Sequence, residues 1–307
     1  MTKIGKALRW TTVRETFFRV AASGYVPPTL FLPSVPDARS LPGRSGELSV
    51  EIVSHCWKYH HLLAYQLSSL VLYPPSRGSV RMTVFYAPED EATAALLAWF
   101  GKKEIPRVEW NWQALDKPYL MRRAIGRNLA ARATRADWVW FTDCDVIFHE
   151  GCLDGLFEQI DGCREPLVFP RYERVTTLLD NGDPLLTAAA AAPALVRIDP
   201  EEFPIRVSPQ AKGGYQITHG DVARAVGYCG PLSIYQEPSD RWRKAHEDRA
   251  FRWLLRTDGV ALDIPSVYRI CHSEKGRYGS NRTISWIRGA VHRAGSRLAA
   301  RRAGARS

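Results

Sequence analysis

Two aspartates separated by one residue, Asp143 and Asp145, directly follow the apolar segment 138–142. This segment has the character of a buried strand, and residues two apart in an extended chain point to the same side. We therefore expect the two carboxylates to stand together at a strand end. Carboxylate oxygens suit Mg²⁺ or Mn²⁺, which can bridge to the phosphate oxygens of a diphosphate. The pattern is also common in solvated turns, but its position after a strand favours the metal site.

A second acidic pair, Glu247 and Asp248, stands at the start of the helix predicted for residues 247–256. A carboxylate within hydrogen-bond reach can take the proton from an acceptor hydroxyl, which is a poor nucleophile by itself. Acidic residues at a helix start also have a structural explanation, because the helix dipole favours negative charge there. Asp248 and Glu247 are therefore both kept as catalytic candidates.

Two smaller features add candidates for binding. Gly213 and Gly214 form a pair that lets the backbone approach a ligand closely and donate from its amides, although an ordinary turn would look the same. His272 follows a strand predicted for residues 267–270. An imidazole there is suited to be a third metal ligand beside the carboxylates, and the alternative is a polar loop residue.

Strands and helices alternate in the segments that must position these residues. The predicted strands are 48–53, 80–86, 107–112, 138–142 and 168–172, and the predicted helices are 62–71, 89–100 and 118–135. In the last helix we expect Met121, Ile125 and Leu129 to form the buried face, with Arg123 and Arg127 on another. The alternation predicts an α/β fold with a mostly parallel sheet and helices on both faces. Ligands then collect beyond the carboxyl ends of the strands.

Three segments together resemble glycosyltransferase family 2 and its GT-A relatives, including the galactosyltransferase-like domains. They are residues 127–146, with Arg-Asn-Leu-Ala and the Asp-x-Asp loop, residues 212–215 and residues 246–249. The resemblance covers roughly residues 48–279. It implies a Rossmann-like GT-A fold and metal-dependent transfer of a sugar from a nucleotide-diphosphate sugar, with a UDP-sugar favoured. The acceptor is a hydroxyl of a glycan or of a lipid-linked molecule, and inversion is expected.

The resemblance also implies roles for single residues. Arg127, with Asn128 beside it, approaches the donor diphosphate or base, Asp143 contacts donor and metal, and His272 completes the metal site. By the same resemblance Asp248 acts as the general base toward the acceptor, with Glu247 beside it as the second catalytic candidate. Where the family binds the nucleotide, this chain has the unusual segments 54–57 and 87–90. Asp90 is our candidate for a nucleotide contact there. These departures leave the identity of the base open.

Other classes of function stay open beside this one. A retaining transferase uses a similar sheet, and so does a sugar nucleotidyltransferase. The latter is disfavoured because no glycine-rich phosphate loop ending in Lys or Arg opens the first strand. A non-catalytic, basic, membrane-associated adaptor is the alternative outside enzymology, and the intact Asp-x-Asp and Glu-Asp pairs argue against it.

The formal net charge of +10 resides in the two ends of the chain. Residues 1–20 hold five cations against one acid, and residues 281–307 hold seven arginines and no acid. The middle is therefore close to neutral, which excludes a basic nucleic-acid-binding body. We expect a basic, Pro-rich segment at 1–47, a GT-A domain at 48–280 and a basic amphipathic tail at 281–307. That tail predicts attraction to an anionic membrane surface.

Six cysteines show no zinc-like spacing, and no apolar run reaches the length needed to span a bilayer. The cysteines are therefore expected to be reduced thiols. Together with the basic tails, these features predict a cytoplasmic protein, peripheral at the inner face of the membrane.

Overall fold

The computed structural model describes residues 13–180, 182–240 and 246–272. Its centre is a seven-stranded sheet in the order β10-β6-β9-β4-β1-β2-β3, in which β9 runs antiparallel to both of its neighbours and the other pairings are parallel. The strands are β1 Ser49–Cys56, β2 Ser79–Tyr86, β3 Val108–Ala114, β4 Trp138–Phe141, β6 Leu167–Pro170, β9 Gln216–His219 and β10 Val260–Leu262. The central strands β1, β4 and β9 are buried along almost their whole length because both faces of the sheet are covered.

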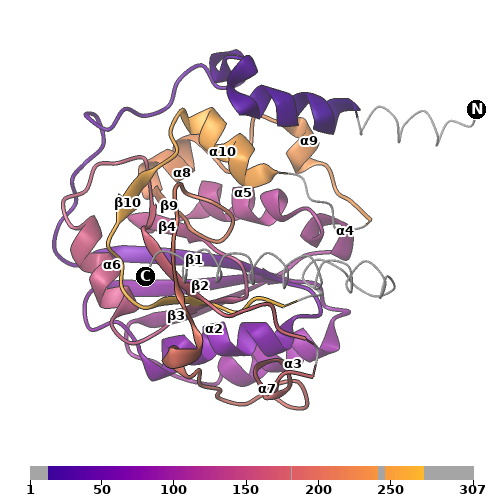
Figure 1. The fold of residues 1–307 in the computed structure, drawn as a ribbon. Coiled ribbons are helices and arrows are strands. Elements are labelled where there is room, and N and C mark those ends of the chain that lie inside the picture. The colour runs from indigo at the N-terminus through magenta and orange to yellow at the C-terminus, as the bar shows by residue number, and fades with distance from the viewer. Residues whose placement is uncertain (1–12, 181, 241–245, 273–307) are drawn as a thin grey trace, which may run out of the picture.

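Helices cover both faces of this sheet (Figure 1). On one face lie α2 His60–Leu72, α3 Glu91–Phe100 and α6 Cys152–Ile160, and on the other α5 Arg123–Ala133, α8 Gly220–Val226 and α10 Glu247–Leu255. The short helices are α4 Lys117–Leu120, α7 Pro184–Thr187 and α9 Ser233–Gln236. Each face has its own apolar core between sheet and helices. The predicted α/β architecture with a mostly parallel sheet is confirmed.

A second, four-stranded sheet lies beside the first and has the order β5-β11-β7-β8. Its strands are β5 Val146–Phe148, β7 Tyr172–Val175, β8 Ile205–Val207 and β11 Val267–Arg269. The single strand predicted over 168–172 is wrong in one respect. The chain leaves the large sheet after Pro170 and enters the small one at Tyr172, so this stretch serves two sheets.

The helix predicted over 118–135 is two helices, with a break at Met121 and Arg122 between α4 and α5. Its predicted buried face is also partly wrong, since the side chain of Leu129 is 49% exposed and that of Arg127 only 1%. Arg127 is buried because it has polar partners in the core, which an apolar pattern cannot register.

The Pro-rich N-terminal segment packs onto the helix layer. Its residues 13–20 are helical, and a π-helical turn follows at Ala21–Tyr25. The indole Nε1 of Trp253 in α10 donates to Val26 O over 2.9 Å, and Arg256 donates to the carbonyls of Leu32 and Pro33. The segment therefore packs along α10, and we call residues 13–47 the N-terminal arm. Whether a domain boundary falls at residue 47 stays a prediction.

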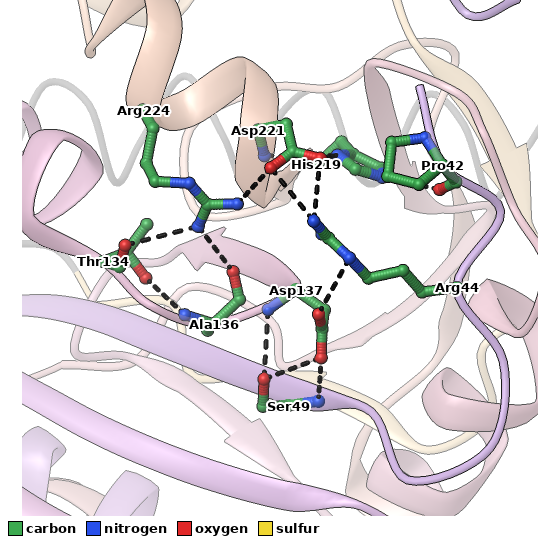
Figure 2. A network of polar contacts seen from close by, with 9 residues as sticks. All are labelled: Pro42, Arg44, Ser49, Thr134, Ala136, Asp137, His219, Asp221 and Arg224. Atoms are coloured by element: carbon green, nitrogen blue, oxygen red, sulfur yellow. Dashed lines mark hydrogen bonds and ion pairs between the residues drawn. The ribbon is translucent and has the colours of Figure 1, made fainter. Parts of the chain in front are cut away.

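A polar network fastens the end of this arm to the residues just before β4 (Figure 2). The Asp-x-Asp turn follows the other end of this strand. Arg44 lies between two carboxylates, with its Nε 3.4 Å from Asp137 Oδ1 and its Nη2 2.9 Å from Asp221 Oδ2. His219 Nε2 lies 3.2 Å from Pro42 O. The network joins the arm to the starts of β4 and α8.

Within the described residues no helix is both long and apolar enough to cross a bilayer. The predicted tail 281–307 and its apolar stripe lie outside the described residues.

Candidate functional site

The two aspartates of the Asp-x-Asp pattern lie in a turn. β4 ends at Phe141, and the amide of Val146 donates to Asp143 O over 3.1 Å. The alternation expected from a strand therefore does not apply, and the two side chains differ in environment. Asp145 is 1% exposed, whereas the side chain of Asp143 is 15% exposed. Of the two, Asp143 is the one that solvent or a ligand can reach.

A buried amide holds this turn in place. Gln66, in the middle of α2, donates from Nε2 to Asp143 O over 2.9 Å and to Val146 O over 2.8 Å. From the other side, the amide of Ile270 donates to Asp145 O. The turn is thus fixed by α2 and by the end of β11. Sequence reasoning missed Gln66, although a glutamine among the apolar residues of a helix was an available signal.

Two arginines of α5 converge on Asp143. Arg127 Nη2 lies 3.2 Å from Asp143 Oδ1, and Arg123 Nη1 forms an ion pair with the same oxygen. Arg127 also donates to Tyr228 Oη over 2.9 Å and to Thr142 O over 3.1 Å. The spacing of four places both guanidiniums on one helix face. Arg123 was not among the predicted site residues, but its spacing from Arg127 could have identified it.

The electrostatics of this cluster are dominated by the acids around Arg123. Burial acts to lower the pKa of Arg123, but Asp143, followed by Glu247, Tyr228 and Asp248, raises that pKa above its ordinary value. The guanidinium is therefore held charged beside three carboxylates. Such a group is suited to meet a phosphate that enters beside Asp143.

The glycine pair packs against the same turn. A Cβ at Gly214 would lie 2.9 Å from the Asp143 amide nitrogen and 3.1 Å from Val146 Cγ2, and Gly213 has a φ of +46°. The indole Nε1 of Trp140 fixes Gly214 through its carbonyl at 2.9 Å. The close backbone approach expected of the pair is thus an approach to Asp143, and a donor contact by either glycine stays a prediction.

The start of α10 meets the glycine pair from the opposite side. The amide of Gly213 donates to Asp248 Oδ2 over 3.2 Å, and Gln216 Nε2 donates to Asp248 O over 3.1 Å. The side chain of Asp248 is 34% exposed, so its carboxylate is positioned and still accessible. The structure therefore brings Asp143, Gly213 and Asp248 together from three distant parts of the chain.

Glu247 has a different environment from its neighbour Asp248. It is 7% exposed, and its Oε2 has no hydrogen-bond partner among the described residues. Burial raises the pKa of Glu247 above its ordinary value, and the guanidiniums of Arg123, Arg127 and Arg122 oppose this rise without cancelling it. Of the two acids, Asp248 is therefore the one whose carboxylate is accessible.

Glu247→Gln should stabilise the protein at neutral pH. The folded state holds the Glu247 proton more tightly than the unfolded chain, so native stability falls as pH rises through the folded pKa, and an uncharged isostere escapes this loss. We expect thermal midpoints of variant and parent to coincide at about pH 4 and to diverge in favour of the variant at about pH 7. The exposed Glu158→Gln is the matched control and should show no divergence. A variant less stable than the parent at neutral pH would contradict this assignment.

Two predicted residues, Asn128 and Asp90, form their hydrogen bonds outside this cluster. Asn128 donates to Gln236 Oε1 and accepts from the Tyr228 amide, which ties α5 to α9. Asp90 caps α3 and accepts from the Lys58 amide. Their predicted contacts with the nucleotide stay predictions.

His272 packs between aromatic rings. Its ring centroid lies 5.0 Å from that of Tyr59 and 6.5 Å from that of His61. Among the described residues, no three His, Cys, Asp or Glu side chains are arranged to hold a metal ion. The three-ligand site of Asp143, Asp145 and His272 is therefore not assembled in this structure.

The carboxylates nevertheless fit a metal that is shared with phosphates. The ion pairs with Arg123 and Arg127 both use Asp143 Oδ1. The other oxygen, Oδ2, faces Gly213, where an added Cβ would lie 4.0 Å from it. Mg²⁺ is commonly held by one or two protein carboxylates, with substrate phosphates and water completing its shell. Asp143, the accessible member of the pair, is a carboxylate of this kind.

No family model matches this chain, and none of the curated proteins does. Its fold is similar to two crystal structures of S. aureus TarS residues 1–349. The first has a TM-score of 0.46 and 10% identity, covering 80% of this chain and 65% of that one. The second, in complex with UDP, has a TM-score of 0.45 and 11% identity, covering 74% and 62%. The chain thus matches less than two thirds of either structure. At this level of likeness, function has to be inferred from the residues of the site.

Proposed function

We propose that this protein is a metal-dependent glycosyltransferase. It transfers a sugar from a nucleotide-diphosphate sugar, preferably a UDP-sugar, to a hydroxyl of a glycan or lipid-linked acceptor. The observation that supports this most is the meeting of Asp143, Gly213 and Asp248 beside the paired arginines. Anion-binding cations, a metal-suited carboxylate and an accessible candidate base then lie within one site.

At the donor end, Asp143 would hold Mn²⁺ or Mg²⁺, which would neutralise charge on the departing diphosphate, and the buried Asp145 would support the turn behind it. Arg123 is the arginine better placed to contact that diphosphate, because its side chain is 24% exposed and that of Arg127 1%. Arg127 instead fixes the position of Asp143 through its bonds to Tyr228 and Thr142. The roles expected of Arg127 are thus divided between the two arginines.

At the acceptor end, Asp248 would take the proton of the attacking hydroxyl. The acceptor oxygen forms a bond to the anomeric carbon, and the bond from that carbon to the diphosphate oxygen breaks. A base on the face of the sugar opposite the leaving group would give inversion of configuration. The Gly213 amide would orient the Asp248 carboxylate for this step through its bond to Oδ2.

A panel of nucleotide-diphosphate sugars, each with and without Mn²⁺, tests the proposal. One donor should raise the thermal midpoint only when the metal is present, since a ligand at about 100 times its Kd adds about 2.7 kcal/mol to folding stability. The same donor should be hydrolysed slowly in a metal-dependent manner. Absence of both effects for every donor would refute a transferase. Consumption of a nucleoside triphosphate with a sugar 1-phosphate would instead identify a nucleotidyltransferase.

A further inference from the structure

The N-terminal helix, residues 13–20, is fastened to the domain by one of its faces. Arg14 Nη1 lies 2.9 Å from Glu237 Oε1, and its Nη2 donates to Ser233 Oγ over 2.8 Å. Glu15 pairs with the buried Arg122. The ring of Phe18 contacts Phe31 and Tyr235, with centroids 5.3 Å and 6.4 Å away. The rotation of the helix about its own axis is therefore fixed, and its other face is set toward solvent.

That other face is apolar. Val13, Phe17 and Val20 recur at spacings of four and three, and they are 58%, 47% and 48% exposed. Two further exposed apolar residues follow, Tyr25 at 80% and Leu30 at 72%. These five make up nearly half of the large exposed hydrophobic side chains of the described residues. We call them the apolar face. All five fall within residues 13–30, and such a concentration in one short segment indicates an interaction surface.

A cationic pocket adjoins the apolar face. Its volume is about 600 Å³, and Gly24 and Thr29, the chain neighbours of Tyr25 and Leu30, are part of its wall. The opposite wall is α10 and the residue after it, from which Arg249, Arg252 and Arg256 line the pocket. Asp258 is the one acidic residue of the lining and is paired with Arg252. The pocket therefore has an excess of positive charge.

We propose that the apolar face and this pocket form a docking surface for an anionic lipid membrane. Apolar side chains beside cations are the combination that lies in a membrane interface, with the side chains among the lipid chains and the cations at the head groups. The charge of the N-terminal sequence also favours an anionic membrane, because residues 1–20 hold five cations and one acid. The pocket is suited to a head-group phosphate, which arginine binds through paired donors.

The surface lies on the helix layer that also supplies the candidate base. In Figure 1 the N-terminal helix runs beside α9 and α10, and Asp248 is in the first turn of α10. Docking would thus bring the acceptor side of the site near the lipid. This consequence rests on the proposed function, whereas membrane binding itself does not.

Vesicle co-sedimentation of the full chain tests the surface without any sugar donor. We expect binding to phosphatidylcholine vesicles that contain phosphatidylglycerol and little binding to phosphatidylcholine alone. Phe17→Ser with Val20→Ser should lower the partition coefficient by about tenfold or more, because two apolar side chains no longer enter the interface. The matched control is Ile205→Ser with Val207→Ser on β8, where the side chains are 57% and 65% exposed. It should bind like the unaltered chain.

Two further variants separate the apolar and the cationic parts. Tyr25→Ser with Leu30→Ser lies outside the helix and should also weaken binding, which guards against an effect on helix folding alone. Arg249→Ala should weaken binding to the anionic vesicles, and the exposed Lys102→Ala should not. Unchanged binding of both apolar variants would overturn the proposal, as would a full chain that binds neither type of vesicle. Because no donor is present, this result is independent of the transfer reaction.

Discussion

Asp248→Asn is expected to lower turnover by about 10² to 10⁴, the usual contribution of a positioned general base. The variant keeps the shape of the side chain and an oxygen for the Gly213 amide, so the geometry of the glycine pair should persist. Donor binding should be retained, because Asp248 stands on the acceptor side of that pair. Initial rates with saturating donor, together with a donor titration followed by thermal stability, measure the two effects separately.

Asp258→Asn is the matched control for this experiment. Asp258 lies just beyond the other end of α10, is 75% exposed and pairs with Arg252, the arginine that is also near Asp248. Its replacement should leave turnover unchanged. Asp248→Asn with normal turnover and weakened donor binding would show that the base has been assigned to the wrong residue.

Asp143→Ala is expected to abolish metal-dependent donor binding and to destabilise the fold as well. Arg127 is almost fully buried, and removing its carboxylate partner leaves a buried cation with only neutral partners. Loss of one member of a buried pair costs about 3 kcal/mol. Denaturant unfolding and donor-dependent thermal shifts in Mn²⁺ measure both losses.

Asp263→Ala provides the comparison for stability. Asp263 also pairs with an arginine, Arg171, but the two side chains are 62% and 45% exposed, and such pairs contribute at most about 1 kcal/mol. We expect the free energy of unfolding to fall only slightly in Asp263→Ala and strongly in Asp143→Ala. Donor binding that survives in Asp143→Ala would exclude this residue from the metal and donor site.

The order of the larger elements could be predicted because it depends on local pattern. The apolar segment around Trp140 predicts a strand that is buried on both faces, and the spacing of apolar residues in 62–71 predicts α2. The break between α4 and α5 could not be predicted in this way. Helical periodicity continues across Met121 and Arg122, so it does not mark where the chain changes direction.

The candidate site shows the same limit at the level of single side chains. Sequence motifs predicted Asp143, Gly213 and Asp248 as members of one site, and the glycine pair does link them, since Gly214 packs against Asp143 and Gly213 donates to Asp248. The expectation of two equivalent aspartates is wrong, because burial of Asp145 depends on the turn and on its bond to Ile270. Partners such as Gln66 and Tyr228 are 77 and 101 residues away from the groups they hold, and no local pattern encodes such a pairing.

The network around Arg44 restricts when during synthesis the N-terminal arm can reach its final position. Arg44 is made early, but its partner Asp221 is 177 residues further along the chain. His219, which meets Pro42 O, belongs to β9, and β9 enters the sheet between β4 and β6. The contact of Arg44 with Asp137 can form early, but the contacts of the arm with Asp221 and His219 cannot form on a ribosome that has made only the first half of the protein. Until β9 has emerged from the ribosome and inserted beside β4, strands β1 to β4 lack both this neighbour and the fastened arm.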